Sequence, residues 1–168
     1  MRQLSTLTLL IFLGFNATLT AQRSAHRFID HFKNENKCIA MTIPGYMIRT
    51  GFNFASKFSD DNKEQKIYKS LGKHFKKMRF MVIEEDSNIT NSNVADLLTD
   101  LRESDRLEEY VKVRDNDTRV TVFMNEADEI IKDLVLVIKG DEEFALVIFK
   151  TDLPLNLLKE AKFSFNDN

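Results

Sequence analysis

The chain has 168 residues, of which 24 are basic and 26 acidic, so its formal charge is −2. This near-neutral balance excludes nucleic acid as a bulk electrostatic partner. The single cysteine, Cys38, excludes an intramolecular disulfide. Because Cys38 lies in the apolar run 38–41 and cysteine is among the most buried residue types, we expect it to be a structural residue rather than a reactive thiol.

Residues 1–21 have the pattern of a cleavable signal peptide. Arg2 precedes an apolar run from Leu4 to Phe15, and the small Ala21 precedes the polar Gln22. An apolar run of about a dozen residues covers only about 18 Å at ~1.5 Å per residue, well short of the roughly 30 Å core of a bilayer. We therefore expect cleavage near Ala21, with the exact bond left open. A buried first helix and an uncleaved anchor are the alternatives.

The expected mature chain is long enough for one domain over residues 22–168. Removal of residues 1–21, which include one arginine and no acidic residue, leaves 147 residues with a formal charge of −3. A second run of about 18 apolar residues is absent, so we expect no transmembrane anchor after cleavage. Cys38 lies 16 residues past Gln22, whereas a lipid-acceptor cysteine would be the first mature residue. The expected product is exported, periplasmic or secreted, soluble and not lipid-anchored.

The first two-thirds of the chain predicts four helices and two strands. Apolar residues at i, i+3, i+4 and i+7 indicate the helices, and Ser24 and the segment 60–62 are the expected N-caps of the first and third. Pro44 and Gly45 end the first strand. In chain order, the predicted elements are a helix over 24–34, a strand over 37–43, helices over 45–58 and 63–76, a strand over 79–84 and a helix that carries residues 94–101.

The last third predicts strands joined by short polar gaps. The strands are expected over 108–114, 119–125, 130–139 and 143–150. Because gaps of this length suit hairpins, we expect an antiparallel meander. A last helix is expected over 154–161, with Thr151 or Asp152 as its cap and residues 163–165 trailing beyond it.

Helices in the first two-thirds and hairpins in the last third predict an α+β fold. We expect a mostly antiparallel sheet with a C-terminal hairpin meander and helices packed on one face. The apolar runs 134–138 and 144–149 predict inner strands that helices cover on at least one face.

Several patterns along the chain together resemble a known family. They are the export signal, the short helix that ends Phe-x-x-His-Phe-Lys, the apolar strand 38–43, the entry 76–80 to the second strand and the Val-x-Val-x-Lys-Gly hairpin. With these patterns the chain resembles the family called domain of unknown function 4252, which implies a small exported protein of Bacteroidota. Many members carry a lipobox cysteine where this chain has Gln22. No activity or binding residue is carried over, because the family has none established.

The segment 115–118 has the Asp-x-Asp-x-Thr pattern of phosphoryl-transferring hydrolases. In that chemistry Asp115 would be the nucleophile and Asp117 the acid or base, beside Mg²⁺. The segment lies too near the end of the chain for a parallel α/β core to follow it, so we interpret it as a hairpin turn. A calcium loop is not expected, because the required glycine and the closing glutamate are missing at the needed spacing.

His26, His31 and His74 are the histidines of the chain. The first two are five residues apart, which does not place them on one helix face, and no acidic motif accompanies them at metal-ligand spacing. The chain has neither a nucleophile motif nor a glycine-rich phosphate loop. We therefore expect no metal and no cofactor.

The predicted helix 45–58 carries more aromatic and methionine side chains than one packing face would bury. Either a neighbouring helix covers the surplus, or the surplus forms an apolar groove or a partner surface. The candidate binding residues are Tyr46, Met47, Phe52, Phe54 and Phe58.

A second candidate surface is a basic stripe opposite the apolar face of the predicted helix 63–76. It is either an ordinary solvated face or a contact surface for acidic surface glycans, lipid phosphates or an acidic protein. The stripe consists of Lys66, Lys69, Lys73, Lys76 and Lys77.

Since no catalytic motif is visible, we expect a non-catalytic binding, interaction or regulatory module of the cell envelope. Its expected partner is an envelope protein or an apolar ligand. The alternative is a small extracytoplasmic hydrolase whose active-site residues meet only in three dimensions. A cleft in which a histidine, a carboxylate and a nucleophile converge would favour the hydrolase, and an apolar groove would favour the binding module.

Overall fold

The computed structural model describes residues 22–166, except for residues 60, 85–88, 116 and 142. Side chains are described up to residue 160. The predicted signal peptide, residues 1–21, lies outside this range. Among the described residues, no helix is both long enough and apolar enough to cross a membrane.

The described residues form five helices and one six-stranded antiparallel sheet, which confirms the predicted α+β class. The strand order is β1-β2-β6-β5-β4-β3, so β5 and β6 are inner strands, as predicted. The strands are β1 (Cys38–Pro44), β2 (Phe75–Ile83), β3 (Glu108–Asp115), β4 (Thr118–Ala127), β5 (Ile130–Lys139) and β6 (Phe144–Pro154).

Strands β3 to β6 form the predicted meander of successive hairpins. Asp128 and Glu129, which join β4 to β5, have φ angles of 55° and 60°. Two successive residues with positive φ make a hairpin turn whose twist matches that of the flanking strands. At the segment expected to be a hairpin turn, Asp115 ends β3 and Thr118 begins its antiparallel neighbour β4, while residue 116 lies outside the described residues.

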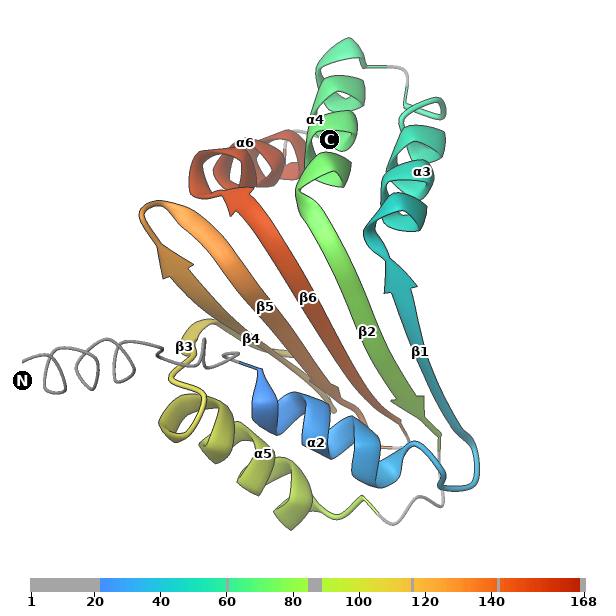
Figure 1. Cartoon of the computed structure of the whole chain (residues 1–168), viewed down its shortest axis with the longest axis vertical. Coiled ribbons are helices and arrows are strands. Elements are labelled where there is room, and N and C mark those ends of the chain that lie inside the picture. The colour runs from blue at the N-terminus through green and yellow to red at the C-terminus, as the bar shows by residue number, and fades with distance from the viewer. Residues whose placement is uncertain (1–21, 60, 85–88, 116, 142, 167–168) are drawn as a thin grey trace, which may run out of the picture.

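Two helices, α2 (Arg23–Phe32) and α5 (Asn91–Glu103), pack side by side on one face of the sheet, which we call the covered face (Figure 1). Both helices have the predicted amphipathic pattern, and Ala25, Ile29 and Leu101 are fully buried. The strand residues beneath them are Met81, Ile83, Phe123, Val135, Val137, Phe144, Leu146 and Ile148. Helix packing on this face explains why every second residue of β5 and β6 is buried.

The other three helices, α3 (Gly45–Ala55), α4 (Asn62–His74) and α6 (Leu155–Asn166), gather beyond one end of the strands (Figure 1). Their apolar side chains form a second, smaller cluster with the nearby strand ends. Its buried members are Ile67, Leu71, Met124, Ile131, Leu153 and Leu157.

Helices α3 and α4 pack closely at Gly72. A Cβ added at Gly72 would lie 2.8 Å from the Cβ of Phe52. The Phe52 ring stacks on Phe75, with centroids 5.6 Å apart, and Phe75 in turn meets the edge of Phe149 at 5.1 Å. This row of aromatic rings attaches α3 to the sheet.

Several predicted element ends are wrong. Ser24 is not the N-cap of α2, because the helix begins at Arg23 and the Ser24 amide donates instead to the Asp105 carboxylate. Neither Thr151 nor Asp152 caps the last helix, since both residues belong to β6 and pair with other elements. Helix α6 also continues to Asn166, through the residues expected to trail out. The predicted cap at Asp61 is confirmed, as its side chain accepts from the Lys63 amide at 2.8 Å.

Candidate functional site

The structure exposes four of the five predicted binding residues of α3 and the turn that follows it. Tyr46 is 71% exposed, Met47 52%, Phe54 61% and Phe58 72%. We call these four residues the α3 aromatic surface. Phe52, the fifth predicted residue, is half-buried and packs against α4 and β2 instead.

The helix period separates the exposed residues from Phe52. Met47 and Phe54 are spaced by seven residues, which places them along one side of the helix, and Phe58 lies in the turn that follows the helix end at Ala55. The Phe54 and Phe58 rings meet edge to face with centroids 4.8 Å apart. Gly51 leaves open space beside them, since a Cβ added there would have no neighbour within 4 Å. The α3 aromatic surface is therefore a ridge of large apolar groups in solvent.

A second apolar surface, which sequence reasoning missed, covers the side of the sheet opposite α2 and α5. The register of the five strand pairs aligns apolar side chains from all six strands in two rows. One row is Ile39, Val82, Ala145, Ile138, Val120 and Val113, and the other is Met41, Phe80, Val147, Leu136, Val122 and Val111. We call these twelve residues the open face.

Helices α3, α4 and α6 pack on the same side of the sheet, against Met124 and Leu134 in the row next to the open face. Within the described part of the chain, neither buried cluster includes any of its twelve residues. At the sheet edges, Ile39 is 59% exposed and Met41 53% on β1, and Val113 is 50% exposed on β3. The interior positions are half-buried because they touch their neighbours in the same sheet.

The predicted lysine stripe is divided between two elements. Lys66, Lys69 and Lys73 are exposed on α4, but Lys76 and Lys77 lie in β2, because the helix ends at His74. The prediction of one helical stripe is therefore wrong for Lys76 and Lys77. Pairing with β6 draws this segment into the sheet.

His74 and Lys76 both bind Asp152, near the start of β2. The Nδ1 atom of His74 lies 3.2 Å from one Asp152 oxygen, and the Nζ atom of Lys76 lies 3.1 Å from the other. Burial acts to raise the pKa of Asp152, but the hydrogen bonds from Lys76 and His74 outweigh it and hold the pKa below its usual value. Among the described residues, no serine, threonine or cysteine side chain is hydrogen-bonded to the His74 ring.

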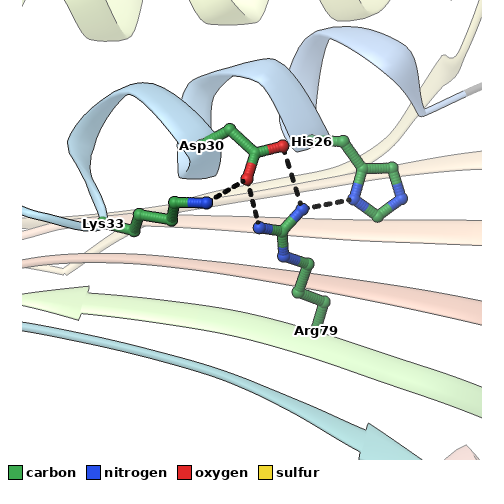
Figure 2. A network of polar contacts seen from close by, with 4 residues as sticks. All are labelled: His26, Asp30, Lys33 and Arg79. Atoms are coloured by element: carbon green, nitrogen blue, oxygen red, sulfur yellow. Dashed lines mark hydrogen bonds and ion pairs between the residues drawn. The ribbon is translucent and has the colours of Figure 1, made fainter.

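Arg79 of β2 connects the sheet to α2 through a polar network (Figure 2). Its guanidinium donates to Asp30 at 2.8 Å and lies 3.3 Å from Nδ1 of His26, and Lys33 donates to Asp30 at 3.1 Å. Burial, and next the charge of Arg79, lower the pKa of His26, so a neutral ring accepts from the arginine. The hydrogen bonds from Arg79 and Lys33 hold the pKa of Asp30 far below its usual range. All the charges are paired, so the network positions α2 rather than presenting a free reactive group.

A buried polar cluster lies on the sheet near irregularities in β4 and β5. Asp133 is 2% exposed and accepts from Nζ of Lys150 at 2.8 Å and from Nδ2 of Asn125 at 3.2 Å. Because these two donors satisfy the buried carboxylate, the cluster has the geometry of a structural ion pair.

The described residues contain no group of three or more His, Cys, Asp and Glu side chains that could hold a metal ion. Cys38 is half-buried against the main core, and burial raises the pKa of its thiol. A cleft of about 490 Å³ lies between α5 and strands β3 to β5. Its lining contains the basic Arg119 and Lys139 as well as the acidic Asp117 and Asp141, so neither sign of charge predominates in the cleft.

The model of the family described as Domain of unknown function (DUF4252) matches residues 32–161. This range covers most of the chain. The chain belongs to the DUF4252 family. No curated protein and no solved structure matches it.

The part of the chain that matches the DUF4252 model contains all six strands and helices α3, α4 and α5. Both apolar surfaces of this DUF4252 protein therefore lie inside the matched region. His26 and Asp30 lie outside it, so half of the polar network belongs to the segment before the match.

Proposed function

We propose that this protein is an exported, non-catalytic interaction module of the cell envelope that binds a partner protein through the α3 aromatic surface. The observation that carries the proposal is the exposure of four large apolar side chains on one helix and its following turn. Phenylalanine, tyrosine and methionine are enriched at the centres of protein interfaces. The signal-like residues 1–21 support the exported location.

The spacing of the exposed residues favours a helix-in-groove contact. Met47 and Phe54 follow one side of α3, as the anchors of a helix that enters an apolar groove do, and the Phe58 ring meets Phe54 from the turn after the helix. Helix α4 packs beside α3 and carries the exposed Lys69 and Lys73. We therefore propose a partner with an apolar groove and an acidic rim, which the lysines would meet.

Affinity capture from an envelope extract tests this function. The mature protein should retain a partner that the Phe54→Ala, Phe58→Ala double variant loses, because truncation of interface aromatics removes the anchors. Tyr110→Ala is the matched control, since Tyr110 is 43% exposed on β3, far from α3 in the chain. Capture that is unchanged in the double variant would refute the proposed surface.

Two additional measurements separate a specific contact from instability. Phe54→Ala and Phe58→Ala should keep the wild-type melting temperature, whereas Phe52→Ala should lower stability by about 2 kcal/mol because Phe52 is half-buried. Charge reversal with Lys69→Glu and Lys73→Glu should weaken capture, and added salt should weaken wild-type capture. Capture that is insensitive to both changes would exclude the acidic rim.

A small hydrolase is the second candidate function, and the His74–Asp152 pair is the observation that favours it. In this mechanism His74, oriented by Asp152, would act as a general base on a water molecule. Turnover of an activated ester that His74→Ala abolishes would support the hydrolase, provided that the variant keeps its fold. Equal turnover by both proteins would exclude this pair as the catalytic group.

A further inference from the structure

We propose that the cleft between α5 and strands β3 to β5 binds a phosphorylated sugar, with the phosphate group on its basic floor. We call this cleft the α5 cleft. The proposal uses residues other than those of the α3 aromatic surface and does not depend on that surface binding a partner. It rests on three observations, which are a group of cations without ion-pair partners, a buried hydroxyl group without a partner and the separation of the two signs of charge in the lining.

Strand register gathers basic side chains on the floor of the α5 cleft. Arg119 of β4 is the register partner of Lys139 of β5, and Thr121, two residues further along β4, is the partner of Lys112 of β3. Val137, the β5 partner of Thr121, belongs to the main core, so all of these side chains lie on the covered face. The Cβ atoms of directly opposite residues lie about 4.5–5.5 Å apart, and like charges in such positions destabilise a sheet.

Among the described residues, no carboxylate forms an ion pair with Lys112, Arg119 or Lys139. The ion pairs of the described residues use other cations, such as Lys150 with the buried Asp133. Lys112 and Arg119 are exposed, Lys139 is half-buried, and all three line the cleft. A bound anion would relieve the repulsion among them, and guanidinium and ammonium groups are the side chains that bind phosphate in proteins.

A buried hydroxyl group opens into the same cleft. Thr121 is only 4% exposed, and its hydroxyl group has no hydrogen-bond partner among the described residues. Since no fully buried side-chain oxygen of the described residues lacks a partner, this oxygen is accessible from the cleft that Thr121 lines. A polar group in a largely buried position requires a hydrogen-bond partner, which here comes from the contents of the cleft. The hydroxyl group can donate to a phosphate oxygen beside Lys112 and Arg119.

The start of α5 adds to the attraction for an anion. Asn91, the first residue of the helix, lines the cleft. The capping box between Thr90 and Asn93 occupies the Asn93 amide, and the amides of Asn91 and Ser92 precede it. The first amides of a helix have no partner within the helix, and its N-terminus carries a partial positive charge. The helix end therefore supports the three cations in holding a phosphate group.

The acidic residues of the lining lie between the strands rather than on the floor. Asp117 lies between β3 and β4, and Asp141 lies between β5 and β6. Both also line an adjoining cleft of about 690 Å³, together with Glu84 and Glu143. Carboxylates accept hydrogen bonds from hydroxyl groups, and a volume of about 490 Å³ is that of a small-molecule site. A phosphorylated sugar meets both parts of the lining, because it carries a phosphate group on a body rich in hydroxyl groups.

Isothermal titration calorimetry of the mature protein tests the site, with glucose 1-phosphate as the probe. We expect glucose 1-phosphate to bind, inorganic phosphate to bind more weakly and glucose not to bind. Lys139→Gln should weaken the binding of glucose 1-phosphate about tenfold, because it removes a charge-assisted hydrogen bond. Lys132→Gln is the matched control, since it removes the same charge from the same strand about 23 Å away and should bind as the wild type does. Equal losses in the two variants would overturn the proposal, as would a wild-type protein that binds no glucose 1-phosphate at millimolar concentration.

Two further variants test the hydroxyl group and the acidic residues separately. Thr121→Val keeps the branched shape of the side chain, so it should keep the wild-type melting temperature and weaken the binding of glucose 1-phosphate several-fold. Asp141→Ala should weaken the binding of glucose 1-phosphate but strengthen that of inorganic phosphate, because it removes a hydroxyl acceptor and a negative charge together. Unchanged affinities in both variants would overturn the site. Flotation of the protein with phosphatidylglycerol vesicles, without binding of glucose 1-phosphate, would overturn it in favour of a membrane surface.

Discussion

The backbone amide of Ser24 donates a hydrogen bond of 2.8 Å to the carboxylate of Asp105, 81 residues further along the chain. Ser24 lies in the first turn of α2, and Asp105 follows the end of α5. Both residues are buried. A carboxylate near a helix N-terminus satisfies an amide that has no partner within the helix and interacts favourably with the helix dipole. Asp105 thus caps α2 from another part of the chain and joins the two helices of the covered face.

Replacement of Asp105 by alanine should destabilise the protein by about 1–2 kcal/mol, because the buried Ser24 amide would lose its acceptor. Chemical denaturation measures the change. The matched control is Asp100→Ala, since Asp100 is an exposed carboxylate on α5 that lies 4.0 Å from Arg27 and should contribute less than about 0.5 kcal/mol. Equal losses in the two variants would show that the Asp105 cap has no special role.

Two glycine-to-alanine substitutions in neighbouring helices should have opposite effects. Gly51→Ala should stabilise the protein by about 0.5–1 kcal/mol, because the position is helical and an added Cβ has open space. Gly72→Ala should destabilise it by about 1–3 kcal/mol, because the new Cβ would lie 2.8 Å from Phe52. Thermal denaturation of both variants decides the outcome, and a stabilised Gly72→Ala would contradict the close packing of α3 on α4.

Acid should destabilise the fold in two steps. The folded state lowers the pKa of His26 below its usual 6.5, mainly by burial, so the unfolded chain binds more protons there and stability falls as the pH drops below about 6.5. The folded state also lowers the pKa of Asp30, through hydrogen bonds from Arg79 and Lys33. That contribution is present above the usual 3.8 and is lost as the pH falls further.

The variant His26→Asn should remove the first step and keep the second. Its amide oxygen can accept from Arg79 but does not titrate. The denaturation midpoint should be measured between about pH 8 and pH 3, a range that includes the reference pKa of histidine at about 6.5. In the variant, the midpoint should no longer change with pH near about 6.5 but should still fall at lower pH. A variant that retains the full wild-type profile would assign the first step to another group.

Cys38 should react slowly with a thiol reagent in the native protein and rapidly in denaturant. Its side chain is half-buried against the main core, and burial, with a smaller contribution from Glu35, raises the pKa of the thiol. The thiolate is the reactive form, so both effects slow the reaction. Absorbance of the released chromophore follows the rate, and rapid native labelling would show that the thiol is accessible.

Local sequence signals determined most of the secondary structure. Strand β5 has the predicted bounds of 130–139, and Asp61 caps α4 as expected. Turns and caps of this kind depend on residues that are close in sequence, so the chain itself specifies them. The surplus of aromatic residues after Gly45 also pointed to α3 as a candidate surface, although sequence alone did not separate Phe52, which packs inward, from Phe54 and Phe58.

The tertiary structure decided the features that depend on distant partners. Lys76 and Lys77 continue the helical charge pattern, but pairing with β6 places them in a strand. The cap of α2 is Asp105 rather than the predicted Ser24, because only the packed fold brings the end of α5 beside α2.

The distinction between the covered face and the open face arises in the same way. Side chains alternate between the two faces of a strand, so the sequence of a strand determines which of its residues share a face. Apolar residues occupy both faces of the inner strands, so the sequence of β5 and β6 is equally compatible with one covered face or two. Where the helices pack is set by the connections and by the shape of the whole chain. In this protein α2 and α5 bury one face, and α3, α4 and α6 pack against one end of the other, at Met124 and Leu134.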